Sequence, residues 1–175
     1  MKGVKVNFTV NGDKVSIEVK PYETLLETLR ERLYLTGAKE SCSLGSCGSC
    51  TVILDGIPVR SCLVLAPEVE GKNIATVEGL EKDGTLHPLQ EAFMEKGAVQ
   101  CGFCTSGMIL TAKALLDRQK KPSKKSNRSD YLFQYMPLYR IQKDYRSRYD
   151  CGGKNGSNLN LVFYRLYCQT HQATH

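Results

Sequence analysis

Four cysteines in the first third of the chain constrain its fold more than any other feature. They are Cys42, Cys47, Cys50 and Cys62, and four, two and eleven residues separate them in turn. This spacing is typical of plant-type [2Fe–2S] centres, in which four thiolates bind two irons. The spacing therefore predicts a chain that wraps a tight loop around a two-iron cluster.

The residues between these cysteines suit the same chemistry. Gly45 and Gly48 tolerate positive φ and close approach, so the backbone can turn its N–H groups toward the sulfurs. The other small polar residues of the loop leave room for the irons; they are Ser41, Ser43, Ser46 and Ser49. We expect this loop to be shaped by the centre that it holds.

Three other readings of the four cysteines remain open: a zinc site, a disulfide pair, and buried free thiols. Structural zinc sites usually combine two C-x2-C pairs, whereas only one of these gaps has two residues. A disulfide framework suits a secreted chain, and no apolar signal region follows Met1 and Lys2. Eight cysteines without such a signal favour metal ligation in a reducing compartment, the cytoplasm.

A second pair, Cys101 and Cys104, lies far downstream in the stretch from Gln100 to Gly107. A C-x2-C pair by itself is ambiguous between a redox dithiol, half of a zinc site and half of an iron–sulfur site. Its meaning depends on the first group of cysteines.

Taken together, the two groups resemble the small [2Fe–2S] subunit of the xanthine oxidase (molybdenum hydroxylase) family. The matching stretches are Glu40–Val52, Arg60–Cys62 and Gln100–Met108, and the resemblance covers about residues 3–123. Ser106 is a small departure, because the family usually has proline there.

The resemblance implies an electron-transfer subunit with no catalytic centre of its own. Electrons would leave a molybdopterin site on a large partner subunit, cross two [2Fe–2S] clusters, and reach FAD on a medium partner subunit. Cys101 and Cys104 would ligate the second cluster, and Gln100 matches a family position that approaches the pterin. The alternative is a stand-alone ferredoxin that serves soluble reductases, which needs neither the second pair nor a helical second half.

Patterning up to residue 78 predicts a β-grasp, ferredoxin-like domain. Residues 4–10 and 15–19 alternate around an Asn11–Gly12 turn, which indicates a β-hairpin. A helix then opens with a capping box between Thr24 and Glu27 and is expected to end at Gly37. Further strands are expected at residues 51–54, 57–65 and 73–77.

From Gly84 the periodicity becomes helical, with helices expected at residues 87–96 and 105–117. The second has an apolar stripe of Met108, Ile109, Ala112, Leu115 and Leu116. The fold class is therefore α+β: a β-grasp domain at 1–78, the first half of a small helical [2Fe–2S]-binding bundle at 79–123, and a tail at 124–175.

The tail differs in composition from the rest of the chain. Residues 1–117 carry 12 Lys and Arg against 15 Asp and Glu, whereas residues 118–175 carry 12 against 3 and seven of the nine tyrosines. Such a segment can be read as a nucleic-acid-binding arm or as a solvated disordered tail. We favour a third interpretation, in which the segment is frameshifted. This interpretation excludes nucleic acid as a partner. No apolar run is long enough to span a membrane.

The family resemblance implies a Cys-Arg-Cys-Thr-Gly-Tyr motif that supplies the remaining two ligands of the second cluster, about 32 residues after Cys104. That position is Met136, and the only later cysteines, Cys151 and Cys168, belong to no C-x-C pair. Read one nucleotide later, codons for residues 136–142 can spell the whole motif in register. We therefore interpret residues 124–175 as frameshifted, which leaves the bundle incomplete and Met108, Leu115 and Leu116 partly uncovered.

Overall fold

The computed structural model of the chain describes residues 2–95, 98–99 and 101–118. Three expectations lie outside these residues: the position of Gln100, the end of the helix expected at residues 87–96, and everything that concerns residues 124–175, including Cys151 and Cys168.

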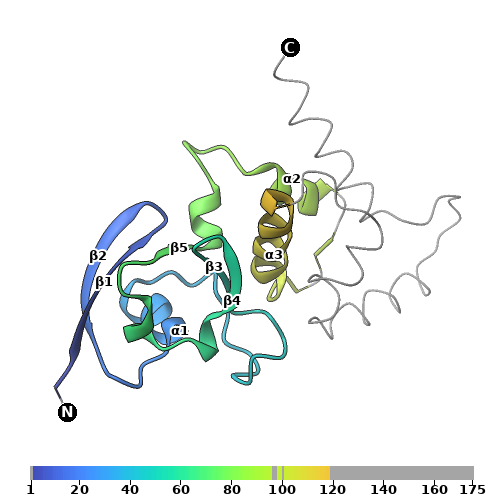
Figure 1. Cartoon of the computed structure of the whole chain (residues 1–175). Helices are drawn as coiled ribbons and strands as arrows, with labels where there is room; N and C mark the ends of the chain where they lie inside the picture. Colours follow the sequence, from blue (N-terminus) through green and yellow to red (C-terminus); the bar gives the residue numbers. More distant parts are fainter. Residues whose placement is uncertain (1, 96–97, 100, 119–175) are drawn as a thin grey trace, which may run out of the picture.

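A five-stranded mixed sheet forms the first half of the described chain (Figure 1). Its order is β2-β1-β5-β3-β4, with β1 and β5 parallel and all other neighbours antiparallel. The strands are β1 (Val4–Val10), β2 (Asp13–Val19), β3 (Thr51–Leu54), β4 (Ile57–Arg60) and β5 (Asn73–Ala75).

The first hairpin is confirmed. Val10 pairs with Asp13 across the turn, and Asn11 and Gly12 have φ of 52° and 95°. Two consecutive residues with positive φ match the twist of the flanking strands, which is why Asn-Gly is favoured in such turns.

The helix after this hairpin begins as expected but is shorter and wider. The Thr24 N–H donates to the Glu27 carboxylate (2.7 Å), and the Glu27 N–H donates to the Thr24 hydroxyl (3.2 Å), so the capping box is confirmed. However, α1 covers only Leu25–Glu27, and a π-helical turn follows at Thr28–Arg32. The expected end at Gly37 is therefore wrong. The wider turn directs Arg32 back to the buried carboxylate of Glu23, where it forms hydrogen bonds of 3.0 and 2.8 Å.

The second hairpin is also shorter than expected. Strand β4 ends at Arg60 instead of residue 65, because a 3-10 turn at Ser61–Leu63 redirects the chain. The Ser61 hydroxyl donates to the Cys50 carbonyl oxygen (2.7 Å), which ties this turn to the segment before β3. Strand β5 likewise ends two residues earlier than expected, and further 3-10 turns lie at Ala66–Val69 and Val77–Leu80.

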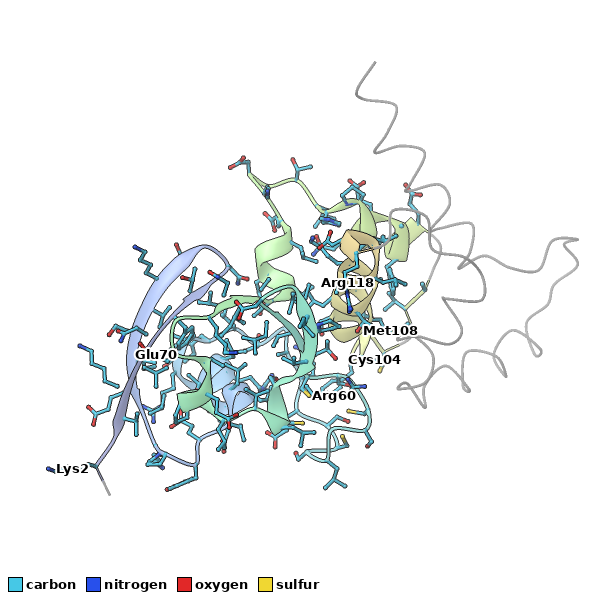
Figure 2. All side chains as sticks on the ribbon, viewed as in Figure 1. Lys2, Arg60, Glu70, Cys104, Met108 and Arg118 are labelled. Carbon is cyan, nitrogen blue, oxygen red and sulfur yellow. The ribbon has the colours of Figure 1, made fainter. Side chains whose placement is uncertain are left out.

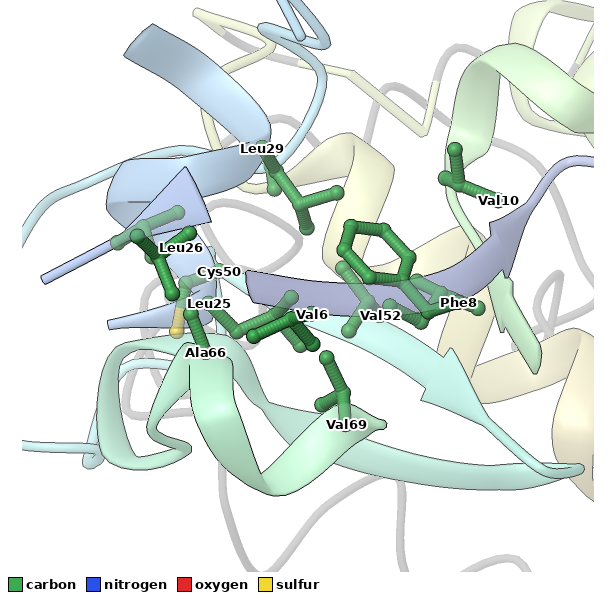
Figure 3. Packing of buried hydrophobic residues seen from close by; sticks show 13 residues of the cluster. Val6, Phe8, Val10, Leu25, Leu26, Leu29, Cys50, Val52, Ala66 and Val69 are labelled. Carbon is green, nitrogen blue, oxygen red and sulfur yellow. The ribbon is translucent and has the colours of Figure 1, made fainter. Parts of the chain in front are cut away.

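One core lies between the sheet and α1 (Figure 3). Its members alternate along the strands and recur on one side of the helix, as the expected patterns require. They include Val6, Phe8, Val10, Val52, Leu25, Leu26 and Leu29, each at most 6% exposed.

A second core joins the sheet to the helical half, α2 (Pro88–Glu95) and α3 (Thr105–Arg118). Ile53 of β3 belongs to this core while its neighbour Val52 belongs to the first, so β3 is covered on both faces. The stripe on α3 is confirmed for Ile109 and Ala112. Leu115 is buried, at 6% exposure, so the expectation that it is partly uncovered is wrong, because it packs within this second core. Met108 and Leu116 are partly buried. None of the described helices is long and apolar enough to cross a membrane.

Candidate metal centre

The first four cysteines come together from two segments of the chain. Cys42, Cys47 and Cys50 lie on the loop that leads into β3, and Cys62 lies in the 3-10 turn after β4. The hairpin of β3 and β4 folds this turn back, so that Arg60 pairs with Thr51, the residue after Cys50.

Within this group the thiols form two pairs. The sulfurs of Cys50 and Cys62 lie 3.4 Å apart. The backbone N–H of Cys47 donates to the sulfur of Cys42 at 3.4 Å, and the thiols of these two residues are also in contact. All six described cysteines are free thiols in this structure.

Hydrogen-bond donors surround one of the sulfurs. The hydroxyl of Ser46 and the backbone N–H groups of Leu44 and Cys47 lower the pKa of the Cys42 thiol to about 6. In contrast, burial and the neighbouring Cys50 thiol raise the pKa of Cys62 to about 11. The loop therefore stabilises negative charge on the Cys42 sulfur. In an iron-bound centre, the same hydrogen bonds would act on the Cys42 thiolate.

The backbone conformation explains how the N–H groups reach the sulfurs. Ser43, Gly45 and Gly48 have φ of 50°, 70° and 76°. Alternating turns of this kind direct successive N–H groups into one concavity, which favours an anionic group. The positive φ of Gly45 and Gly48 agrees with the expectation from the sequence. The positive φ of Ser43 and the hydrogen bond donated by Ser46 were not expected. No pattern in the sequence distinguishes these two serines from their neighbours.

The arrangement of the four thiols in two pairs indicates which kind of metal centre these residues would hold. Among the described residues, no three His, Cys, Asp or Glu side chains gather closely enough to hold a single metal ion. A tetrahedral zinc site would need all four thiols around one point. Two pairs of thiols suit a centre with two metal ions, each bound by one pair, so the residues fit a [2Fe–2S] cluster better than zinc.

The second pair lies at the start of α3. Cys104 immediately precedes this helix, and its sulfur lies 3.8 Å from the sulfur of Met108 (Figure 2). Cys101 is exposed and Cys104 is partly buried. Burial raises the pKa of Cys104, and the nearby thiols of Cys101 and Cys47 raise it further. The structure thus places the second pair beside the first group, although 53 residues of sequence separate Cys47 from Cys101.

Comparison with known families identifies two consecutive matches. Residues 8–80 match a family described as "2Fe-2S iron-sulfur cluster binding domain", and residues 76–134 match one described as "[2Fe-2S] binding domain". The first match contains the four cysteines of the loop and turn, and the second contains Cys101 and Cys104.

Two curated relatives are identical to the chain at about half of the aligned positions. The nicotinate dehydrogenase small FeS subunit of Eubacterium barkeri is 50% identical over 123 residues, which are 70% of this chain and 78% of the relative. The nicotine 6-hydroxylase small subunit of Paenarthrobacter nicotinovorans is 47% identical over 121 residues, which are 69% of this chain and 73% of the relative.

Solved structures agree. Quinoline 2-oxidoreductase from Pseudomonas putida 86 matches with a TM-score of 0.77 and 33% identity over 99% of both chains. The aldehyde oxidoreductase from Desulfovibrio desulfuricans matches with a TM-score of 0.69 and 44% identity, over 73% of this chain and 14% of the larger one.

Proposed function

The chain belongs to the iron–sulfur subunits of the xanthine oxidase (molybdenum hydroxylase) family, and from this premise we propose how its residues perform electron transfer. Cys42 and Cys47 would hold one iron of a [2Fe–2S] cluster, and Cys50 and Cys62 would hold the other. When bound, such a cluster accepts and releases one electron at a time. The observation that supports this assignment is the contact of the thiols in two pairs.

The loop residues adjust the ease of reduction. The hydroxyl of Ser46 and the N–H groups of Leu44 and Cys47 donate to the Cys42 sulfur and so favour added negative charge there. The partly buried side of the site, around Cys50 and Cys62, keeps water from those sulfurs.

Cys101 and Cys104 would hold two of the four ligand positions of the second cluster. Their remaining two partners would belong to the Cys-Arg-Cys-Thr-Gly-Tyr motif, which the codons of the sequence as written can spell only one nucleotide out of frame. By the family resemblance, Gln100 matches a position that approaches the pterin, and it would contribute to that contact with a partner. The second cluster forms only when the motif is present.

The chain works within a complex. Its partners are a large subunit that binds molybdopterin and a medium subunit that binds FAD, in the cytoplasm. Relatives named as subunits of nicotinate, caffeine and aldehyde-oxidising enzymes support this proposal over a stand-alone ferredoxin. Leu44, which is 80% exposed beside the first cysteine group, would contact a partner better than water. Because relatives with different named substrates share this subunit, the partner selects the substrate.

The decisive experiment is the electron paramagnetic resonance spectrum of the dithionite-reduced protein. We expect a [2Fe–2S] signal in the wild type that is lost in Cys47→Ser and retained in the matched variant Cys101→Ser. Co-purification from the native host should then yield a larger complex. A Cys47→Ser protein with an unchanged signal would exclude the proposed ligands, and a monomer that alone oxidises a small substrate would exclude the proposed partners.

A further inference from the structure

Helix α3 lies directly on the backbone of the first cysteine loop at one point. The residue at this point is Gly107, which is buried and has no side chain. A Cβ atom placed on Gly107 would overlap the carbonyl oxygen of Gly48 and lie 3.2 Å from its carbonyl carbon and 3.4 Å from the Cα of Ser49. Any larger residue would therefore separate the helix from the loop between Cys47 and Cys50.

Glycine at this position is unfavourable for the helix itself. Gly107 is the third residue of a 14-residue helix, has no positive φ that would require glycine, and costs about 1 kcal/mol relative to alanine in a helix interior. Alanine would be the better helix residue. The close approach to Gly48 is the physical reason that glycine is needed.

Ser106, the residue before Gly107, makes a second contact between α3 and the first half of the chain. The hydroxyl of Ser106 donates to the carbonyl oxygen of Gly37 at 2.6 Å. The N–H of Gly37 donates in turn to the carboxylate of Glu78 at 2.6 Å, and the N–H of Lys39 donates to the carbonyl oxygen of Ser49 at 3.0 Å. The start of α3 therefore contacts the chain before the first cysteine loop, at Gly37, and the loop itself, at Gly48.

We propose that Gly107 and Ser106 are positioning residues that seat the second cysteine pair on the first cysteine loop, and that in a chain holding both clusters the electron path between them would pass the Gly48–Gly107 contact. This inference rests on the proposed electron-transfer function. Electron tunnelling weakens steeply as redox groups separate, and this is the point where α3, which Cys104 directly precedes, meets the backbone between Cys47 and Cys50. No residue here binds iron; the two residues act by holding the ligands in place.

The test compares three variants of the full chain: Gly107→Ala, Ser106→Ala and, as a control in the same helix, Asp117→Ala. Asp117 is exposed and pairs only with Lys113 in the same helix among its described ion pairs. Helix propensity alone predicts that Gly107→Ala raises the melting temperature, whereas the overlap with Gly48 predicts a fall of about 4 °C or more. Ser106→Ala introduces no overlap and should fall less.

Two further measurements separate positioning from mere stability. In the metal-free chain, alkylation of Cys104 should become several-fold faster in Gly107→Ala and Ser106→Ala but not in Asp117→Ala. In the iron-loaded chain, measured well below the melting temperature, the reduction potential of the first cluster should shift in the same two variants, because Gly48 moves between two of its ligands.

A raised melting temperature for Gly107→Ala would overturn the inference. So would a lowered melting temperature with an unchanged reduction potential, because the contact would then only stabilise the fold. A wild-type chain that takes up no [2Fe–2S] cluster would overturn the proposed function and with it the electron step. The rate of Cys104 alkylation in the metal-free chain would still decide whether Gly107 and Ser106 hold the helix in place.

Discussion

The sulfur atoms of Cys50 and Cys62 lie 3.4 Å apart, although eleven residues and a β-hairpin separate them in the chain. Two thiolates on one tetrahedral metal ion with bonds of about 2.3 Å lie roughly 3.7 Å apart. The protein alone therefore holds this pair almost at the separation that a shared iron requires.

This proximity predicts which disulfide forms when the metal-free chain is oxidised mildly. A disulfide has a bond of about 2.05 Å, so Cys50 and Cys62 need only a small movement to form one. With one equivalent of a diazene oxidant such as diamide, which takes up the two electrons, peptide mapping should find a Cys50–Cys62 link. Prior loading with iron should protect both thiols. A link from Cys62 to Cys42 or Cys47 instead would show that the two pairs are assigned wrongly.

The hydroxyl of Ser46 should raise the reduction potential of the first cluster. It donates to the sulfur of Cys42, and hydrogen bonds to the sulfurs make reduction easier. We expect Ser46→Ala to lower the potential in a redox titration. Ser43→Ala is the matched control, because the Ser43 hydroxyl donates to the Glu40 carboxylate (3.0 Å) and not to a sulfur. Equal shifts in both variants would contradict the assigned role.

The stability of the helical half should depend on pH through His87. Its Nδ1 accepts a hydrogen bond from the Leu89 N–H (3.2 Å) at the start of α2. Burial lowers the pKa of His87, and Lys113 and Lys82 lower it further while Asp117 partly opposes them. The neutral form is thus favoured in the folded state, so this stability is complete above pH 6.5 and is lost as the pH falls through the lowered pKa.

The expected loss is about 1 kcal/mol, the typical contribution of a helix cap. Thermal unfolding between pH 7.5 and 5 measures it. The variant His87→Asn keeps a capping side chain that does not titrate, and its pH dependence should be weaker. A variant that follows the wild-type curve would assign the effect to other groups.

The buried carboxylate of Glu23 should stabilise the fold through Arg32. Burial by itself raises the pKa of Glu23, but hydrogen bonds from Arg32, the Lys20 N–H and the Thr28 hydroxyl outweigh it and hold the pKa below 4.5. This stability is present above pH 4.5 and is lost as the pH falls through the lowered pKa.

We expect Glu23→Gln to reduce the free energy of unfolding by about 1–3 kcal/mol, because the hydrogen bonds to a charged group are lost. Denaturant unfolding at pH 7 measures this change. Lys113→Ala, which breaks the Lys113–Asp117 pair within α3, should cost less than about 1 kcal/mol. Equal costs in the two variants would show that the burial of Glu23 has no consequence.

The nucleotide sequence decides the interpretation of residues 124–175. If the segment is frameshifted, the bases of codons 136–142 spell Cys-Arg-Cys-Thr-Gly-Tyr when read one nucleotide later. Sequencing across codons 115–150 checks this directly. Any other reading of those bases, or a four-sulfur site completed by Cys151 and Cys168 with Cys101 and Cys104, would exclude the frameshift.

Local patterns were sufficient for most of the secondary structure. The Asn11–Gly12 turn, the capping box of Thr24 and Glu27, and the two helices of the second half follow from short-range rules and are confirmed. The lengths of α1 and β4 were wrong, because distant contacts end both elements: Glu23 attracts Arg32 across the π-helical turn, and Ser61 bonds to Cys50. Such contacts leave no periodic signal.

The cysteine spacing predicted the kind of centre, because two irons need four thiolates in a restricted order along the chain, and the two cysteine groups together indicated the family. It could not determine how the two cysteine groups are related in space. Only the tertiary structure decided that β3 is covered on both faces, that α3 packs against it, and that Gly107 meets Gly48. The physical reason is that ligand spacing is a local property of the sequence, whereas the approach of two backbones depends on the packing of every side chain between them.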